Sequence, residues 1–258
     1  MAMVSSPEVL GVLAHDLRWT IVRLLVPGDL RTSELVSSTG QAPSLVSYHL
    51  ARLRDAGLVS VRRSTADGRD SYHALDLDAV GQAVTGMAAG IHPSLAHFGR
   101  PDITGGAADP PGPGGRPRQP ELLFICSGNS SRSPMAEGWL NHLGAGRVRA
   151  RSAGITPGPL HPLAVAAMAE HGVDISGHQA THLDAFAGHN FSRVITLCDR
   201  ARENCGELPV APAAVHWSIP NPAQPHPPDL DAFRATAREL RIRIRHLLPV
   251  LSAGSRVR

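Results

Sequence analysis

The chain has 258 residues, a formal net charge of +3 and a pI near 9.1; 42% of its residues are hydrophobic and 18% are charged. This length allows one or two domains with sizeable cores, and the composition is that of an ordinary globular protein. No apolar run approaches the length of a membrane span and the N-terminus lacks a signal-peptide pattern, so we expect a cytoplasmic protein.

The first predicted elements are three helices. Residues 6–26 carry leucine and isoleucine at helical spacing, with a possible interruption near Asp16. A short helix over 31–39 follows. The next helix, 44–56, ends at Gly57, which suits a left-handed C-terminal cap.

Two strand-like segments, 58–63 and 71–75, come next and are joined by a turn around 67–69. Helix, turn, helix and two-stranded wing is the order of a winged helix–turn–helix domain, which we place at residues 1–98. The segment SLVSYHLARLRDAGLVSVRR, followed by DGRDSYHAL, resembles the recognition helix and wing of ArsR-type repressors.

That resemblance implies a homodimer that binds duplex DNA through this domain. The residues expected to approach base edges are Ser44, Ser47, Tyr48 and His49. The residues expected to meet phosphates are Arg52, Arg54, Arg62, Arg63 and Arg69.

A winged helix used only for protein contacts is the alternative, because residues 1–98 hold eight Arg against nine Asp and Glu. Many ArsR-type sensors bind arsenic through cysteines, but residues 1–98 contain none. We find no trusted metal-ligand spacing and expect no metal site. Residues 99–120 are rich in Gly and Pro and read as a linker.

From 121 to 258 the predicted strands alternate with helices, which is typical of a parallel sheet with helices on both faces. The expected strands are 121–126, 147–153, 193–198 and 214–218. The expected helices are 132–144, 161–172, a further one around 181–187, and 229–248.

The first of these strands delivers Cys126 into a loop of small residues that precedes a helix beginning near Arg132. Such a loop turns successive backbone N–H groups inward around an anion, and the helix N-terminus adds positive potential. This environment favours a thiolate nucleophile, while Arg132 supplies a bidentate clamp and Ser133 a hydrogen bond to sulfur. The residues expected to bind the oxyanion are Ser127, Gly128, Asn129, Ser130, Ser131 and Arg132.

The segment ELLFICSGNSSRSPMAEGW resembles the signature loop of low-molecular-weight protein tyrosine phosphatases and of the arsenate reductases that share their fold. In the phosphatases, an Asp before a Pro protonates the leaving group, and aromatic residues hold the substrate ring. Here the corresponding positions are Asn221 and Ala223, and losing a general acid typically slows a reaction by about 10²–10⁴. This change disfavours ester hydrolysis.

The other two cysteines of the chain, Cys198 and Cys205, follow the predicted strand ending VITLC. Their spacing resembles the redox pair of thioredoxin-coupled arsenate reductases. The resemblance implies a relay in which Cys126 attacks arsenate, Cys198 attacks Cys126, and Cys205 attacks Cys198. We therefore expect no bound cofactor but an external dithiol, thioredoxin.

Two alternatives stay open: a DNA-binding regulator whose phosphatase-like domain senses an oxyanion or redox state, and a low-molecular-weight protein tyrosine phosphatase. The relay also makes a structural demand. If 199–205 is helical, the Cα atoms of Cys198 and Cys205 lie about 10 Å apart, whereas a disulfide needs about 4.4–6.8 Å. The sequence therefore predicts that this segment opens on oxidation.

Overall fold

A computed structural model describes residues 6–92, 119–204, 214–224 and 227–253, which fall into two compact units. The described residues of the first unit lie in 6–26, 32–61 and 75–92. Those of the second lie in 27–31, 62–74 and from 119 onward. The predicted linker, 99–120, lies almost entirely outside the described residues.

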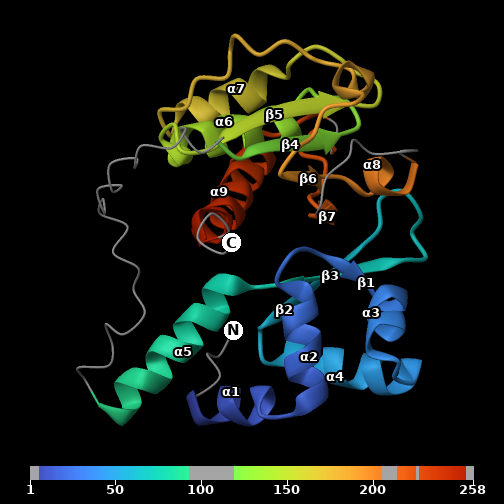
Figure 1. The fold of residues 1–258 in the computed structure, drawn as a ribbon, viewed down its shortest axis with the longest axis vertical. Helices are drawn as coiled ribbons and strands as arrows, with labels where there is room; N and C mark the ends of the chain where they lie inside the picture. The colour runs from blue at the N-terminus through green and yellow to red at the C-terminus, as the bar shows by residue number, and fades with distance from the viewer. Residues whose placement is uncertain (1–5, 93–118, 205–213, 225–226, 254–258) are drawn as a thin grey trace, which may run out of the picture. The chain divides into compact units, whose positions relative to one another are not determined.

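The first unit is mainly helical (Figure 1). Its helices are α1 (Ser6–Leu13), α2 (Asp16–Leu25), α3 (Thr32–Thr39), α4 (Pro43–Asp55) and α5 (Leu77–Ile91). The predicted interruption near Asp16 is confirmed, because the side chain of His15 caps a new helix by accepting a hydrogen bond from the amide of Leu17. Gly57 adopts a φ of 71°, as expected of a left-handed cap.

The small sheet contains both predicted strands of the wing, β2 (Val59–Arg63) and β3 (Ser71–Leu75). A two-residue strand that the sequence did not indicate, β1 (Leu30–Arg31), pairs with β3 in antiparallel fashion. The order among the described residues is β1-β3-β2. Helices followed by this wing give the predicted winged helix–turn–helix arrangement.

The second unit is built on a parallel sheet in which the described strands take the order β5-β4-β6-β7. These strands are β4 (Glu121–Cys126), β5 (Arg149–Gly154), β6 (Arg193–Thr196) and β7 (Ala214–His216). Residues 122–125 of β4 are completely buried, which explains their continuous apolar run. The predicted four-stranded parallel sheet is confirmed.

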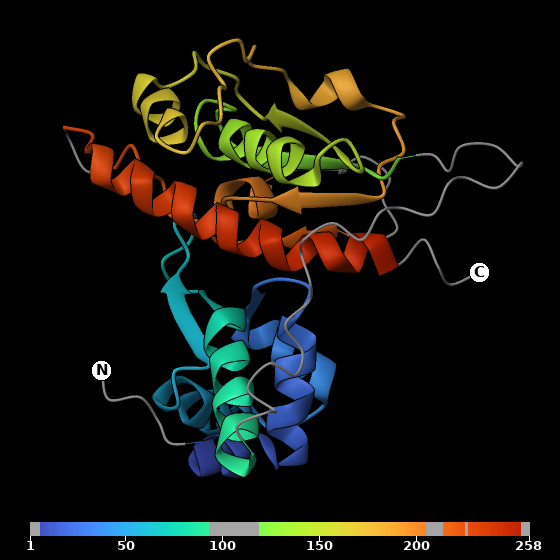
Figure 2. The ribbon, with the colours of Figure 1, turned by 90° about the vertical axis from the view of Figure 1, so that its left-hand side faces the viewer.

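Helices surround this sheet. They are α6 (Arg132–Gly144), α7 (Pro162–Ala169), a 3₁₀-helix (Leu183–Phe186), α8 (Asp199–Asn204) and α9 (Leu230–Ala253). The long α9, drawn in red in Figure 2, packs against α6 and α7. It buries Phe233, Ala237, Leu240 and Ile244 fully, as the helical spacing of these residues predicts.

Among the described helices, none combines the length and the apolar character needed to cross a bilayer.

Candidate active site

The loop between β4 and α6 holds the predicted oxyanion-binding residues 127–131 together, with Cys126 at the end of the strand and Arg132 at the start of the helix. Asn129 adopts a left-handed φ of 45°, a conformation that Asn tolerates better than most residues. Gly154 of β5 lies directly beneath the loop. A Cβ atom at Gly154 would stand 2.8 Å from the backbone nitrogen of Asn129, so only glycine lets the loop approach so closely.

Cys126 is buried, with 1% of its surface exposed, and its sulfur lies 3.0 Å from Oγ of Ser133. Nδ2 of Asn129 donates to the same Oγ over 3.0 Å. Because Ser133 accepts that bond, its single hydrogen can be donated to the sulfur or to the carbonyl of Ala153, which lies 3.4 Å away. Ser133 therefore lies where the sequence predicts a donor to a thiolate.

Asn129 connects this loop to residues distant in the sequence. Its Oδ1 accepts from the amide of Thr181 over 2.8 Å and lies 3.2 Å from Nε2 of His178. Its Nδ2 also donates to Ser152 over 2.8 Å. Burial lowers the pKa of His178 below its ordinary value, although the nearby carboxylate of Glu137 opposes that shift. These partners fix the loop before any substrate arrives.

The guanidinium of Arg132 is buried and anchored at one end only. Nη1 donates to the carbonyl of Ile219 over 3.0 Å, while Nε is buried and has no hydrogen-bond partner among the described residues. A buried donor normally finds an acceptor. Arg132 directly follows the loop in the chain, so this unpaired donor suits the oxygen atoms of a tetrahedral anion.

Cys198 follows β6 closely and is also buried, with 2% of its surface exposed. Its sulfur lies 3.2 Å from Oγ of Ser127, the residue after Cys126, and accepts from the amide of Ala201 over 3.3 Å. Cys126 and Cys198 are both free thiols. The fold thus brings Cys198 against the loop that carries Cys126, whereas Cys205 lies outside the described residues.

A buried polar cluster that no sequence motif reveals lies next to Cys198. Oδ1 of Asp199 lies 3.1 Å from Nε2 of His216 and accepts from Oγ of Ser218 over 2.8 Å. Burial of Asp199 raises its pKa, but the hydrogen bonds from His216, Thr65 and Ser218 outweigh burial and lower the pKa to about 2. The carboxylate is therefore ionised at neutral pH.

The segment expected to hold a phosphatase's general acid contains no carboxylate. Oδ1 of Asn221 accepts from the amide of Ala223 over 3.3 Å, which closes a local turn. Ile219 is tied to Arg132 through its carbonyl, so this segment lies beside the loop. It is adjacent to the site but offers no acid.

The predicted DNA-contacting residues take several environments. Ser44, Ser47, Tyr48, Arg52 and Arg54 are exposed on α4, and Arg63 and Arg69 of the wing are exposed as well. Arg62 is partly buried and pairs with Glu239 over 2.8 Å.

His49 differs from its predicted role. It is 3% exposed, and its ring lies 4.3 Å from that of His15 and within 3.4 Å of the guanidinium of Arg18. Burial, together with His15 and Arg18, lowers the pKa of His49. A side chain so enclosed cannot reach a base edge, so the predicted DNA contact of His49 is wrong. His49 belongs to the core of the first unit.

Comparison with known proteins assigns both halves. Residues 121–256 match the family model described as low molecular weight phosphotyrosine protein phosphatase. Residues 15–61 match the model described as bacterial regulatory protein, arsR family. The two-part architecture expected from the sequence is therefore confirmed.

Curated relatives of the second half include an arsenate reductase of Staphylococcus aureus, 43% identical over 102 residues, which are 40% of this chain and 78% of the relative. Arsenate reductase 2 of Staphylococcus epidermidis is 40% identical over the same shares of both chains. A solved structure described as an arsenate reductase in oxidized state is 31% identical; the match has a TM-score of 0.46 and covers 51% of this chain and 98% of the other.

Proposed function

Because this chain belongs to the low molecular weight phosphotyrosine protein phosphatase family, whose model matches 136 of its 258 residues, we propose that its second half is an arsenate reductase within that family. We propose further that the first half is a DNA-binding repressor domain, so that one chain combines arsenic-responsive chemistry with transcriptional control. A cytoplasmic location is part of this proposal, because a thiol relay needs cysteines kept reduced.

The observation that carries the proposal is the 3.2 Å contact between Cys198 Sγ and Ser127 Oγ. It supports the proposal because a second buried thiol contacts the residue that follows Cys126, the proposed nucleophile. A phosphatase needs one cysteine and a general acid. A reductase of this kind needs a second thiol, which forms a disulfide with the first as arsenic is reduced. Here the second thiol is present and the acid position holds Asn221.

The first step uses the anion site. The thiolate of Cys126 attacks arsenic in arsenate, an As–O bond breaks, and protonated oxygen leaves as water. The loop amides and Arg132 hold the remaining oxygens, while the hydroxyl of Ser133 stabilises the thiolate before attack. Arsenate carries its own protons, so loss of the acid at Asn221 harms this step less than it harms ester hydrolysis.

The second step is the reduction. Cys198 attacks the sulfur of Cys126, a disulfide forms, the S–As bond breaks, and its electron pair stays on arsenic, which leaves as arsenite. Cys205 then attacks Cys198 and Cys126 departs as a thiolate. An external dithiol reduces the Cys198–Cys205 disulfide and is itself oxidised. Thioredoxin is the proposed dithiol.

The proposal for the first half rests on α4 and the wing. Exposed Ser47 and Tyr48 are available to base edges, and Arg63 and Arg69 to phosphates. We propose that the domain dimerises, because α5 is apolar yet none of its described side chains is buried. Val84 and Ile91 of α5 are 47% and 73% exposed.

Arsenate-dependent oxidation of NADPH, coupled through thioredoxin and thioredoxin reductase, tests the enzymatic proposal. Wild-type protein should sustain turnover, and Cys126→Ser should abolish it without unfolding, because a serine hydroxyl is not ionised at neutral pH. Near wild-type turnover in Cys126→Ser would remove Cys126 as the nucleophile. Hydrolysis of p-nitrophenyl phosphate, if faster than arsenate reduction, would instead favour a phosphatase.

A further inference from the structure

The tip of the wing belongs to the same compact unit as the proposed reductase, since residues 62–74 group with the chain from 119 onward. Two groups of Thr65 bond one carboxylate oxygen. The amide of Thr65 donates to Oδ2 of Asp199 over 2.6 Å, and its hydroxyl donates to the same atom over 2.9 Å. Asp199 is the first residue of α8 and immediately follows Cys198.

The other end of α8 is held from the wing as well. Oγ of Ser64 and the hydroxyl of Tyr72 each donate to Oε1 of Glu203 over 3.0 Å. Tyr72 is 1% exposed, and its ring lies 4.6 Å from that of His216. Both burial and Glu203 raise the pKa of Tyr72 far above its ordinary value, so it stays a donor. Three wing residues thus fasten both ends of one short helix.

The segment 27–31 strengthens this contact. Asp29 is 3% exposed, forms a two-bond ion pair with Arg243 over 2.8 and 3.1 Å, and accepts from the amide of Ser218 over 2.7 Å. A Cβ atom at Gly28 would stand 2.6 Å from the carbonyl oxygen of His216. The close backbone approach and the ion-paired, buried carboxylate of Asp29 are features of a specific, well-packed contact.

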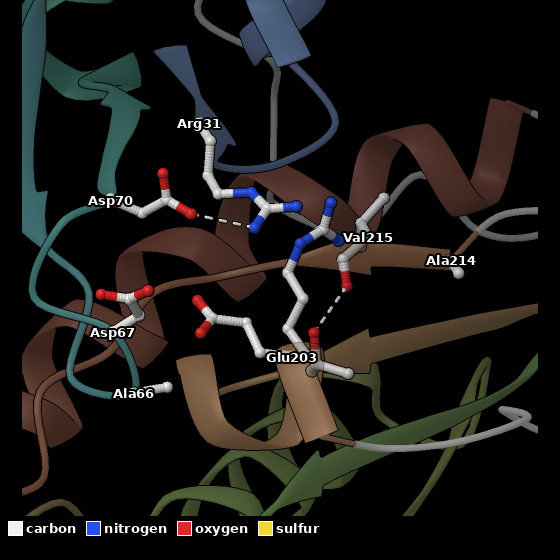
Figure 3. Close-up of a pocket in the computed structure, with 9 residues that line it drawn as sticks. Arg31, Ala66, Asp67, Asp70, Glu203, Ala214 and Val215 are labelled. Atoms are coloured by element: carbon white, nitrogen blue, oxygen red, sulfur yellow. Dashed lines mark hydrogen bonds and ion pairs between the residues drawn. The ribbon is translucent and has the colours of Figure 1, made fainter. Parts of the chain in front are cut away.

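A cavity of about 580 Å³ opens along one side of α8. Figure 3 shows the carboxylates of Asp67, Asp70 and Glu203 around it, together with Arg31, which pairs with Asp70 over 3.0 Å. Since polar groups line this space, water can occupy it and solvate an unwound backbone. The helix therefore has room to open beside the wing.

We propose that the wing is a redox-controlled clamp on α8, through which the thiol state of the relay sets DNA binding. The inference rests on the proposed relay and on the proposed repressor domain. The six residues between Cys198 and Cys205 form α8, whose length of about 9 Å exceeds the roughly 4.4–6.8 Å that a disulfide allows between Cα atoms. Formation of that disulfide must therefore move Asp199 and Glu203 away from Ser64, Thr65 and Tyr72.

The clamp also predicts a direction. In the reduced protein Arg62 donates to the carbonyl of Ser218 and pairs with Glu239, so it is withheld from phosphate. DNA and the second unit compete for the same residues of the wing, and oxidation releases the wing from α8. The oxidised protein should bind DNA more tightly, and by linkage bound DNA should shift the equilibrium toward the Cys198–Cys205 disulfide.

The amide of Thr65 reports the clamp directly, because its hydrogen is bonded to Asp199. Hydrogen exchange at Thr65 should be slow in reduced full-length protein. It should become at least about tenfold faster after diamide oxidation, once peptide mass shows the Cys198–Cys205 disulfide. Cys205→Ser, which cannot form that disulfide, is the control and should stay protected. Unchanged exchange at Thr65 with the disulfide present overturns the clamp.

Tyr72→Phe tests the same contact without any oxidation. It removes the hydroxyl bonded to Glu203 and keeps the ring against His216. Reduced Tyr72→Phe should show faster exchange at Thr65 and about fivefold tighter binding to a labelled duplex from upstream of its own gene. Glu203→Ala should behave likewise, whereas Glu203→Gln, which retains an acceptor, should match wild type.

These outcomes separate the two proposals. If arsenate turnover fails but diamide oxidation and Tyr72→Phe both loosen Thr65, arsenate reduction by the relay is wrong and the redox-sensitive contact between the wing and α8 stands. If turnover succeeds and Tyr72→Phe leaves both exchange and DNA affinity unchanged, the clamp is wrong and the relay stands.

Discussion

The chemistry proposed for Cys126 depends on how neighbouring side chains share their hydrogens. Nδ2 of Asn129 donates to Ser133, whose hydrogen then has the sulfur at 3.0 Å and the carbonyl of Ala153 at 3.4 Å as acceptors, the sulfur being the nearer. Asn129 is itself oriented by the amide of Thr181 and by Ser152. A donor fixed in this way stabilises a thiolate without having to reorganise during attack.

Asp199 gives a prediction about pH. Its pKa of about 2 in the folded chain lies below the value near 3.9 of an unfolded Asp. Because the pKa is lower in the folded chain, ionised Asp199 stabilises the fold. This contribution is complete above about pH 4 and disappears as pH falls toward 2. Asp199→Asn should lower the free energy of unfolding at pH 7 by roughly 2 kcal/mol.

Denaturant unfolding followed by tryptophan fluorescence at pH 7 and at pH 3 measures this difference, which should shrink at the lower pH. Asp174→Asn is the matched control, because that carboxylate is exposed and its hydrogen bonds come from the nearby Ser176. An equal difference between wild type and Asp199→Asn at both pH values would contradict the assignment.

The loop proposed to be catalytic could be predicted because its residues are consecutive in the sequence. Cys126, Arg132 and Ser133 are found together in the sequence and in space. The partners of Asn129 and the Asp199–His216 pair could not be found this way. They lie on separate strands and loops, and an isolated Ser, Thr or His has no local signature.

At the scale of secondary structure, the end of β5 shapes the loop as much as the loop's own sequence does. Gly154 pairs with Cys126 in the sheet register and supports the backbone of Gly128 and Asn129. Since backbone atoms stand at 2.8 and 3.0 Å from the missing Cβ, no side-chain rotation can make room for one.

Gly154→Ala should therefore displace the loop and lower kcat/KM for arsenate by at least about tenfold, equivalent to about 1.4 kcal/mol of transition-state stabilisation. Gly158→Ala is the matched control: nothing lies within 4 Å of its added Cβ, so its kinetics should stay within about twofold of wild type. Equal kinetics for the two variants would show that the loop tolerates the added atom.

The strands and long helices could be predicted from the sequence, because their buried faces require hydrophobic residues at regular spacings or in continuous runs. The apolar run of β4 and the spacing along α9 are examples. Short elements were less predictable. β1 has two residues, and the helix expected around 181–187 is a single 3₁₀ turn, Leu183–Phe186. Elements this short are set by tertiary contacts rather than by local pattern.

At the scale of the whole molecule, sequence alone assigns the wing to a DNA-binding domain, whereas contacts group its tip with the second unit. Neither composition nor periodicity could reveal this grouping. It depends on individual hydrogen bonds between segments more than 130 residues apart, such as Thr65 to Asp199. Residues of the hairpin that the sequence assigns to DNA binding therefore form hydrogen bonds within the second unit.

DNA binding should depend steeply on salt if the wing arginines meet phosphates. Arg63→Ala should weaken binding similarly on all duplexes and reduce the salt slope by about one, whereas Ser47→Ala should change sequence preference. Fluorescence anisotropy over a salt series measures both effects. Arg234→Ala, which removes an exposed pair with Glu170, is the control and should have no effect. Identical salt slopes for Arg63→Ala and Arg234→Ala would remove Arg63 from the phosphate contacts.

The most direct test of the proposed relay is a single turnover without any external dithiol. Fully reduced protein mixed with excess arsenate should release about one arsenite per chain and then stop. Peptide mass should show Cys198 joined to Cys205 and Cys126 returned to a free thiol. Arsenite released while the thiols of Cys198 and Cys205 stay free, or no arsenite at all, would contradict reduction by this relay.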